Sequence, residues 1–162
     1  VNLLDYGCIR TFRPGFVGGV ADLYHALLND DRALAVHAYE TWGFSGLSKE
    51  LIDTLNIWAR FIYRPMLDNR VRSIADGVKP GDYGRAEAQM VRKELKRLGP
   101  VKPPREFVFM DRAAIGLCAV FLHLAAELNW HQLFGDVLQQ FDLAALAERQ
   151  RAAFNRAGVP LP

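Results

Sequence analysis

Apolar residues recur at helical spacing along almost the whole of this chain, and this periodicity limits the possible folds more than any other feature. The clearest row has intervals of three or four residues: Phe16, Val20, Leu23 and Leu27. Such spacing places the side chains along one side of a helix. Alternation with a period of two is confined to the first few residues. We therefore predict an all-α fold of about six to seven helices with one short N-terminal strand, forming a single domain over residues 1–162.

Helix boundaries are predicted from capping residues and helix breakers. Polar residues that favour the N-cap position precede five of the helical patterns: Asp31, Ser48, Asp82, Asn129 and Asp142. Pro65 bends or ends the third helix, and Gly99-Pro100 ends the fourth. Between these two points, residues 66–81 are expected to be irregular because turn signals cluster there.

The fifth predicted helix, from about Arg105 to Leu128, is the most apolar. Apolar side chains surround most of its circumference, so we expect a central, buried helix. One edge differs, with a row at intervals of four, three and four: Arg112, Gly116, Ala119 and His123. Two small residues between two basic or titratable ones predict close approach of another backbone, or the wall of a groove. Because a buried unpaired charge is costly, we expect a salt bridge at Arg112.

Composition excludes several classes of protein. An apolar content of 51% and a charged content of 23% are typical of soluble globular proteins, and a net charge of +2 is too small to indicate a nucleic-acid partner. Cys8 and Cys118 lack the spacing of a disulfide framework or a zinc site, which favours a reducing compartment. The longest apolar stretch, 113–128, is short for a membrane span. We expect a cytoplasmic protein, with peripheral membrane contact left open.

Two further patterns have competing interpretations. The fourth predicted helix carries a basic set, namely Arg85, Arg92, Lys93, Lys96 and Arg97. Such a face is ordinarily solvated, and the alternative is a surface for an acidic partner or an anionic lipid membrane. His37 and Glu40 lie three residues apart on the second helix, as metal ligands often do. The sequence lacks the second carboxylate-rich helix that such a metal site needs.

The opening stretch, Val1 to Gly7, brings an acidic residue to the end of a short apolar run. Asp5 is suited to act as a hard oxygen ligand, and Gly7 allows the backbone to turn sharply after it. An ordinary exit from a strand into a turn has the same pattern. A strand here has no partner strand elsewhere in the sequence, which indicates a piece of a longer protein.

Three features together resemble the C-terminal lobe of the UbiB-like (AarF/ADCK) atypical kinase family. They are Leu3-Leu4-Asp5-Tyr6-Gly7, Gly43-Phe44 after the turn Asn29-Asp30-Asp31-Arg32, and Pro103-Pro104-Arg105-Glu106-Phe107 running on to Asp111-Arg112-Ala113-Ala114-Ile115-Gly116. The resemblance covers nearly the whole chain, although Tyr6 replaces the usual Phe. It implies a kinase-like fold in which Mg²⁺ and ATP bind between two lobes of the parent protein. Asp5 is then the metal ligand, and Asp5 and Gly7 belong to the cofactor site.

The resemblance also implies ATPase or small-molecule or lipid kinase chemistry linked to isoprenoid quinone (ubiquinone) metabolism. The N-terminal lobe, the phosphate-anchoring Lys and the catalytic loop have no counterpart in residues 1–162, so we expect this chain alone to be non-catalytic. Surface that packs on those parts is then exposed, which predicts self-association or fraying of the first residues. The rival hypothesis is an independent helical module that binds a protein or a lipid through the groove beside Arg112 or through the basic fourth helix.

Overall fold

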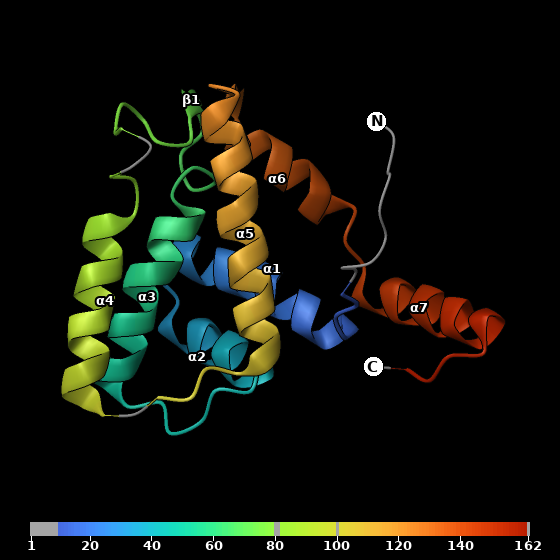
Figure 1. Ribbon diagram of the computed structural model, residues 1–162. Helices are drawn as coiled ribbons and strands as arrows, with labels where there is room; N and C mark the ends of the chain where they lie inside the picture. The colour runs from blue at the N-terminus through green and yellow to red at the C-terminus, as the bar shows by residue number, and fades with distance from the viewer. Residues whose placement is uncertain (1–9, 80–81, 100, 162) are drawn as a thin grey trace.

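The computed structural model describes residues 10–79, 82–99 and 101–161, and it confirms the all-α prediction (Figure 1). About 66% of these residues are helical, with one short antiparallel sheet of two strands. The elements are α1 (Pro14–Asn29), α2 (Arg32–Thr41), α3 (Lys49–Tyr63), β1 (Val71–Ser73), α4 (Arg85–Leu98), α5 (Arg105–His123), β2 (Glu127–Asn129), α6 (Trp130–Gln139) and α7 (Leu143–Ala157). The predicted opening strand, with Asp5 and Gly7, lies outside the described residues.

Four of the five predicted N-caps are confirmed. In each case the side-chain oxygen accepts a hydrogen bond from the backbone N–H three residues later: Asp31, Ser48, Asn129 and Asp142. The prediction for Asp82 is wrong, because Gly84 occupies the N-cap position of α4 with a φ of 77°. Gly84 has no side chain and tolerates positive φ. Its Cα also lies against Phe61, where an added Cβ would come within 2.6 Å of Cζ.

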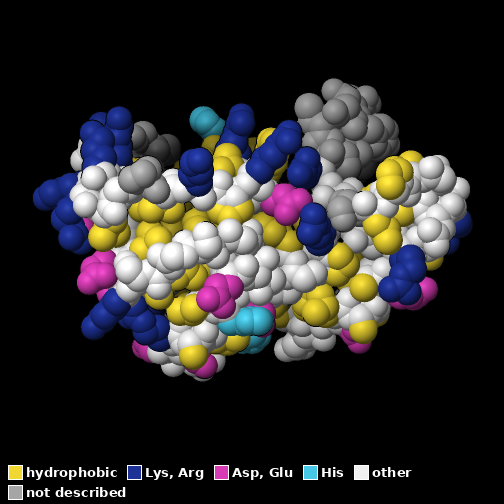
Figure 2. Space-filling model, turned by 90° about the horizontal axis from the view of Figure 1, so that it is seen from below, with side chains coloured by type: hydrophobic (Ala, Val, Ile, Leu, Met, Phe, Trp, Pro, Cys, Tyr) yellow, Lys and Arg dark blue, Asp and Glu magenta, His cyan; other side chains and the backbone are white. Residues whose placement is uncertain are grey.

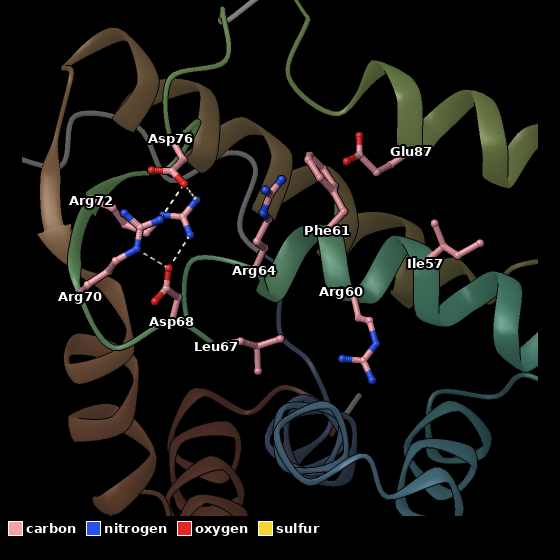
Figure 3. Close-up of a pocket in the computed structure, with 10 residues that line it drawn as sticks. All are labelled: Ile57, Arg60, Phe61, Arg64, Leu67, Asp68, Arg70, Arg72, Asp76 and Glu87. Atoms are coloured by element: carbon pink, nitrogen blue, oxygen red, sulfur yellow. Dashed lines mark hydrogen bonds and ion pairs between the residues drawn. The ribbon is translucent and has the colours of Figure 1, made fainter.

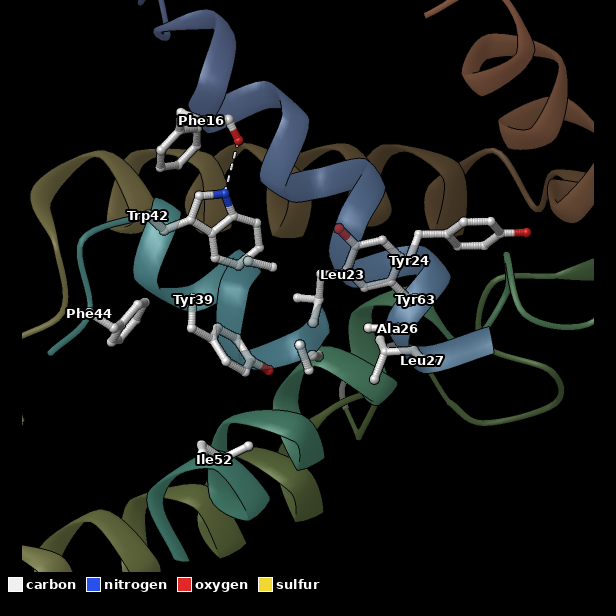
Figure 4. Packing of buried hydrophobic residues seen from close by; sticks show 13 residues of the cluster. Phe16, Leu23, Tyr24, Ala26, Leu27, Tyr39, Trp42, Phe44, Ile52 and Tyr63 are labelled. Atoms are coloured by element: carbon white, nitrogen blue, oxygen red, sulfur yellow. Dashed lines mark hydrogen bonds between the residues drawn. The ribbon is translucent and has the colours of Figure 1, made fainter. Parts of the chain in front are cut away.

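The hydrophobic core is formed where α1, α2 and α3 meet (Figure 4). Trp42, at the C-terminal end of α2, is almost fully buried and donates its indole N–H to the carbonyl oxygen of Phe16 across 2.9 Å. Gly19 lies against the same indole, where a Cβ would come within 2.7 Å of Nε1. Tyr63 of α3 donates its hydroxyl to the carbonyl oxygen of Val20. Aromatic side chains with satisfied polar atoms therefore hold the three helices together.

The short sheet joins two distant parts of the chain. β1 pairs antiparallel with β2, with Val71 opposite Asn129 and Ser73 opposite Glu127. Next to this pair, the buried Trp130 donates its indole N–H to the carbonyl oxygen of Arg72 across 2.8 Å. The segment 66–81, predicted to be irregular, therefore contains a strand. This strand has only three residues, too few to give a readable period of two.

α5 is not the central, buried helix that its composition predicts. None of its residues is fully buried, and Figure 1 places it at the front of the molecule, across the other helices. One side of α5 makes its contacts: Phe107 packs against Trp42, and Phe121 against Trp130. The helix ends at His123 instead of Leu128, because the chain turns at Ala125, where φ is 47°, and enters β2.

Candidate functional site

The chain that follows the Asp5-Tyr6-Gly7 string lies against the first turns of α5. Arg10, three residues after Gly7, has Nη2 3.6 Å from Oε1 of Glu106. Its guanidinium also stands over the ring of Phe109, 4.9 Å from the centroid. A cation above an aromatic face is attracted by the negative face of the ring. Arg10 therefore has two independent contacts with one helix, about a hundred residues further along the chain.

The Gly43-Phe44 pair reaches the same end of α5. Gly43 has a φ of 97°, a conformation that favours glycine, and its position is in van der Waals contact with the ring of Pro104. Phe44 packs edge-on against Phe107, with ring centroids 5.0 Å apart. Residues from two parts of the sequence pattern quoted above thus meet at one place, and Arg10 contacts the same end of α5. We call this place the motif junction and define it by Arg10, Gly43, Phe44, Pro104, Glu106, Phe107 and Phe109.

The motif junction is a packing site and does not form a metal site by itself. Glu106 is its single carboxylate, and it is paired with Arg10. Within 10–79, 82–99 and 101–161, no three His, Cys, Asp or Glu side chains form a group suited to a metal ion. His37 and Glu40 accordingly have no third such side chain beside them among these residues.

Arg112, Gly116, Ala119 and His123 share one exposed side of α5. The salt bridge expected at Arg112 is not found among the described residues, because this guanidinium points to solvent instead of into a core. A Cβ added at Gly116 would meet nothing within 4 Å. Exposed apolar side chains flank the row: Ile115, Leu117, Val120 and Leu124. We call these eight residues together the outward face of α5.

The inward side of α5 carries a contact that the sequence did not reveal. The indole N–H of Trp58 in α3 donates to Oδ1 of Asp111 across 2.6 Å. Burial raises the pKa of Asp111, while the hydrogen bond from Trp58 acts in the opposite direction. Asp111 directly precedes Arg112, so the two charged side chains of this pair leave the helix on different sides. The Asp111 carboxylate faces α3, and the Arg112 side chain is exposed to solvent.

Two arginines and two aspartates form a closed ring of ion pairs after α3 (Figure 3). Oδ2 of Asp68 lies 2.6 Å from Nε of Arg70 and 3.0 Å from Nη1 of Arg72. Oδ2 of Asp76 lies 2.7 Å from Nη2 of Arg70 and 3.1 Å from Nη2 of Arg72, although the last pair is not aligned as a hydrogen bond. The Arg72 side chain is only 3% exposed, so the ring compensates a buried charge.

This ring forms one end of an open hollow of about 610 Å³ between α3 and α4. Phe61 and Leu67 give the hollow an apolar lining, and Arg64 extends into the space between the ring and Glu87 (Figure 3). Both carboxylates of the ring are already shared between two guanidiniums. The ring therefore acts as a support for β1, and thereby for the sheet and for Trp130 of α6.

α4 has a strongly asymmetric charge distribution. Glu87 and Glu94 are half-buried on the side that faces α3. The basic residues are all exposed: Arg85, Arg92, Lys93, Lys96 and Arg97. Figure 2 shows Lys and Arg side chains gathered at the left end of the molecule, where α4 lies. The exposed side of α4 is therefore basic, although the net charge of the chain is only +2.

Among the described residues, no helix combines the length and the apolar character that crossing a bilayer requires. Comparisons with protein-family models, with curated proteins and with solved structures find no match. What the chain does must therefore be inferred from its own residues.

Proposed function

We propose that this chain is the helical C-terminal lobe portion of an atypical kinase or ATPase that resembles the UbiB family. In this proposal the parent protein binds Mg·ATP and acts in isoprenoid quinone metabolism, and residues 1–162 are not catalytic by themselves. Asp5 is a metal ligand, and Gly7 is the turn that allows the chain to continue towards Arg10.

The motif junction is the observation that carries this proposal. Two of the sequence features behind the resemblance, Gly43-Phe44 and the start of α5, lie far apart in the chain and pack against each other. Arg10 also contacts Glu106 and Phe109, and Phe44 contacts Phe107. The contacts of Arg10 support the proposal because a metal ligand needs its neighbouring residues held in place.

The described residues support a positioning role and no catalytic step. They hold no cluster of three metal-binding side chains, so a Mg²⁺ ion at Asp5 would need its other ligands from residues that precede this chain in the parent protein. Bound Mg·ATP would supply the phosphoryl group and the charge neutralisation that phosphoryl transfer needs. The contribution of this chain would be to orient Asp5 through the motif junction.

A Mg·ATP thermal-shift titration tests the proposal. It compares the chain with a longer form that carries the preceding residues of the parent, each with and without Asp5→Asn. We expect stabilisation of the longer form only, and loss of this stabilisation with Asp5→Asn. An equal response in the Asp5→Asn variant, or no response in any form, would overturn the proposal.

A second candidate, an independent module that binds a protein or an anionic membrane surface, is favoured by the charge distribution on α4. Replacing Arg92 and Lys96 with Glu would then abolish binding to vesicles that contain anionic lipid. The matched control replaces Arg149 and Arg156, which lie exposed on α7, with Glu. Salt should weaken this binding, and Asp5→Asn should leave it unchanged.

A further inference from the structure

We propose that the open hollow between α3 and α4 binds a small zwitterion with an apolar body, which is the chemistry of a free apolar amino acid. In this assignment Arg64 binds the carboxylate of the ligand, and Glu87 binds its ammonium group. The hollow shares no residue with the motif junction, and binding here needs no nucleotide. The inference therefore goes beyond the proposed function and can fail independently of it.

The hollow has the size and the lining of a site for a small molecule. Its volume is about 610 Å³, and small-molecule sites measure about 300–1,000 Å³. Ile57, Phe61 and Leu67 supply apolar surface for the body of the ligand. The ring of Phe61 is held in place, because it packs on Trp58 and on Tyr83 with ring centroids 5.1 Å and 4.8 Å apart. This part of the wall is therefore preformed.

Most of the charged groups around the hollow are already paired. Arg60 pairs with Asp30, and the four charges of the ring of ion pairs compensate one another. The ion pairs of α4 leave out Glu87, and among the described residues Arg64 and Glu87 have no ion-pair partner. A ligand that carries one charge of each sign complements these two residues. A purely anionic ligand would be repelled by Glu87, and a purely cationic ligand by Arg64.

The two free charges come from different helices, one on each side of the hollow. Arg64 is the C-cap residue of α3, and Glu87 lies in the first turn of α4. The dipoles of the two helices favour a cation and an anion at these respective ends. Arg64 is exposed and Glu87 is half-buried, and both side chains are long. They can therefore close on a ligand whose carboxylate and ammonium groups share one carbon atom.

The ring of ion pairs offers one further donor at the edge of the hollow. Nη2 of Arg72 is buried and has no hydrogen-bond partner among the described residues, because Asp76 lies 3.1 Å away without the required alignment. Arg72 lines the hollow, and Asp76 is exposed in a turn with a φ of 48°. A small rotation of the Asp76 side chain opens Nη2 to the second oxygen of the ligand carboxylate. The ligand then supplies the acceptor that this buried nitrogen lacks.

Isothermal titration calorimetry with L-phenylalanine and two of its derivatives is the direct test. L-Phenylalaninamide lacks the carboxylate, and N-acetyl-L-phenylalanine lacks the ammonium group, while both keep the apolar ring. We expect one site per chain, with L-phenylalanine bound about tenfold more tightly than either derivative, because each derivative loses one charged contact. Equal affinities for the three compounds, or no binding of L-phenylalanine, would overturn the proposal.

Substitutions on the two walls assign each charge of the ligand to its residue. Arg64→Met should weaken L-phenylalanine binding about tenfold and leave L-phenylalaninamide binding unchanged. Glu87→Gln should weaken L-phenylalanine binding and leave N-acetyl-L-phenylalanine binding unchanged. Arg92→Met, at an exposed position of α4, is the matched control and should change none of the three affinities. If Arg64→Met and Arg92→Met have the same effect, the hollow is not the site.

NMR titration of the native chain locates the ligand without any substitution. Amide chemical shifts should change on addition of L-phenylalanine in residues 57–76 and in the first turn of α4, and they should stay constant in α7. The largest changes falling outside the hollow would contradict the assignment. Asp5→Asn should leave this titration unchanged, so its result is independent of the Mg·ATP experiment.

Discussion

Trp58 and Asp111 form a hydrogen bond of 2.6 Å that ties α5 to α3. The donor and the acceptor are both partly removed from water, and they lie more than fifty residues apart in the chain. The bond fixes the rotation of α5 about its own axis. Since Asp111 must face α3, Arg112 and Gly116 must face outward, and this accounts for the orientation of the outward face.

Asp111→Asn and Asp111→Ala should differ in their effects on stability. Asn keeps an acceptor for Trp58 and removes a carboxylate whose charge is disfavoured by burial, so the free energy of unfolding at neutral pH should hold or rise. Ala leaves the indole N–H without a partner, which costs about 1 kcal/mol. Urea unfolding of the two variants measures the difference. If Asp111→Asn lowers the free energy of unfolding as much as Asp111→Ala does, this view of the contact is wrong.

The pH dependence of this contact follows from the raised pKa of Asp111. The folded state holds the proton more tightly than the unfolded chain, whose carboxyl has a pKa of 3.8. The contribution of this group to stability is therefore fully present below 3.8 and is lost as the pH rises through the interval up to the folded pKa. Urea midpoints followed across this interval should fall in the native chain and stay level in Asp111→Asn.

The ring of ion pairs should give the opposite trend at lower pH. Arg70, followed by Arg72, holds the pKa values of Asp68 and Asp76 below the ordinary value of 3.8. The stability that these groups contribute is present above 3.8 and is lost as the pH falls through the lower folded values. Arg70→Met should therefore reduce the decrease in the free energy of unfolding at acid pH. Arg151→Met, which removes an exposed ion pair within α7, is the control. It should leave the pH dependence of the unfolding free energy unchanged.

Gly19→Ala should destabilise the core, whereas Gly135→Ala should not. A Cβ at position 19 would lie 2.7 Å from Nε1 of Trp42, a buried ring that its hydrogen bond to Phe16 prevents from moving aside. Overpacking of this kind costs about 1–3 kcal/mol. A Cβ at Gly135 meets nothing within 4 Å, so the better helix propensity of Ala should add up to about 1 kcal/mol. Thermal unfolding of both variants measures the contrast.

Trp130→Phe should loosen the sheet without disturbing the core of α1 to α3. The substitution keeps the ring contact with Phe121 but removes the donor to the carbonyl oxygen of Arg72. A buried acceptor without a donor costs about 1 kcal/mol or more. Amide hydrogen exchange should become faster in β1 and β2, while exchange at Leu23 in α1 should not change. Uniform acceleration in both regions would show that the sheet and the core open together.

The local features of the fold could be predicted from the sequence because they depend on nearby residues. The N-caps at Asp31, Ser48, Asn129 and Asp142 require only a polar side chain followed by a helical pattern, and all four form. At Asp82 the same argument failed. A distant contact decided that case, since the close approach of Phe61 requires a glycine at position 84.

Burial and site geometry depend on contacts between distant segments, and these could not be read from composition. The apolar circumference of α5 predicted a buried helix, but composition does not specify how many neighbours surround a helix. Trp58 and Asp111 carry no sequence signal that pairs them. Asp5 and Gly7 lie outside the described residues, so their proposed role at a metal and cofactor site stays a prediction.

α7 rests on the start of the chain along one side. As in α4 and α5, none of its residues is buried. It contacts α1 through Leu143 beside Gly18, and the residues before α1 through Gln150, which donates to the carbonyl oxygen of Phe12. A helix attached along one narrow seam opens with a smaller free energy than the body it rests on. Limited proteolysis should therefore release residues 143–161 first and leave the remaining helices as a resistant fragment.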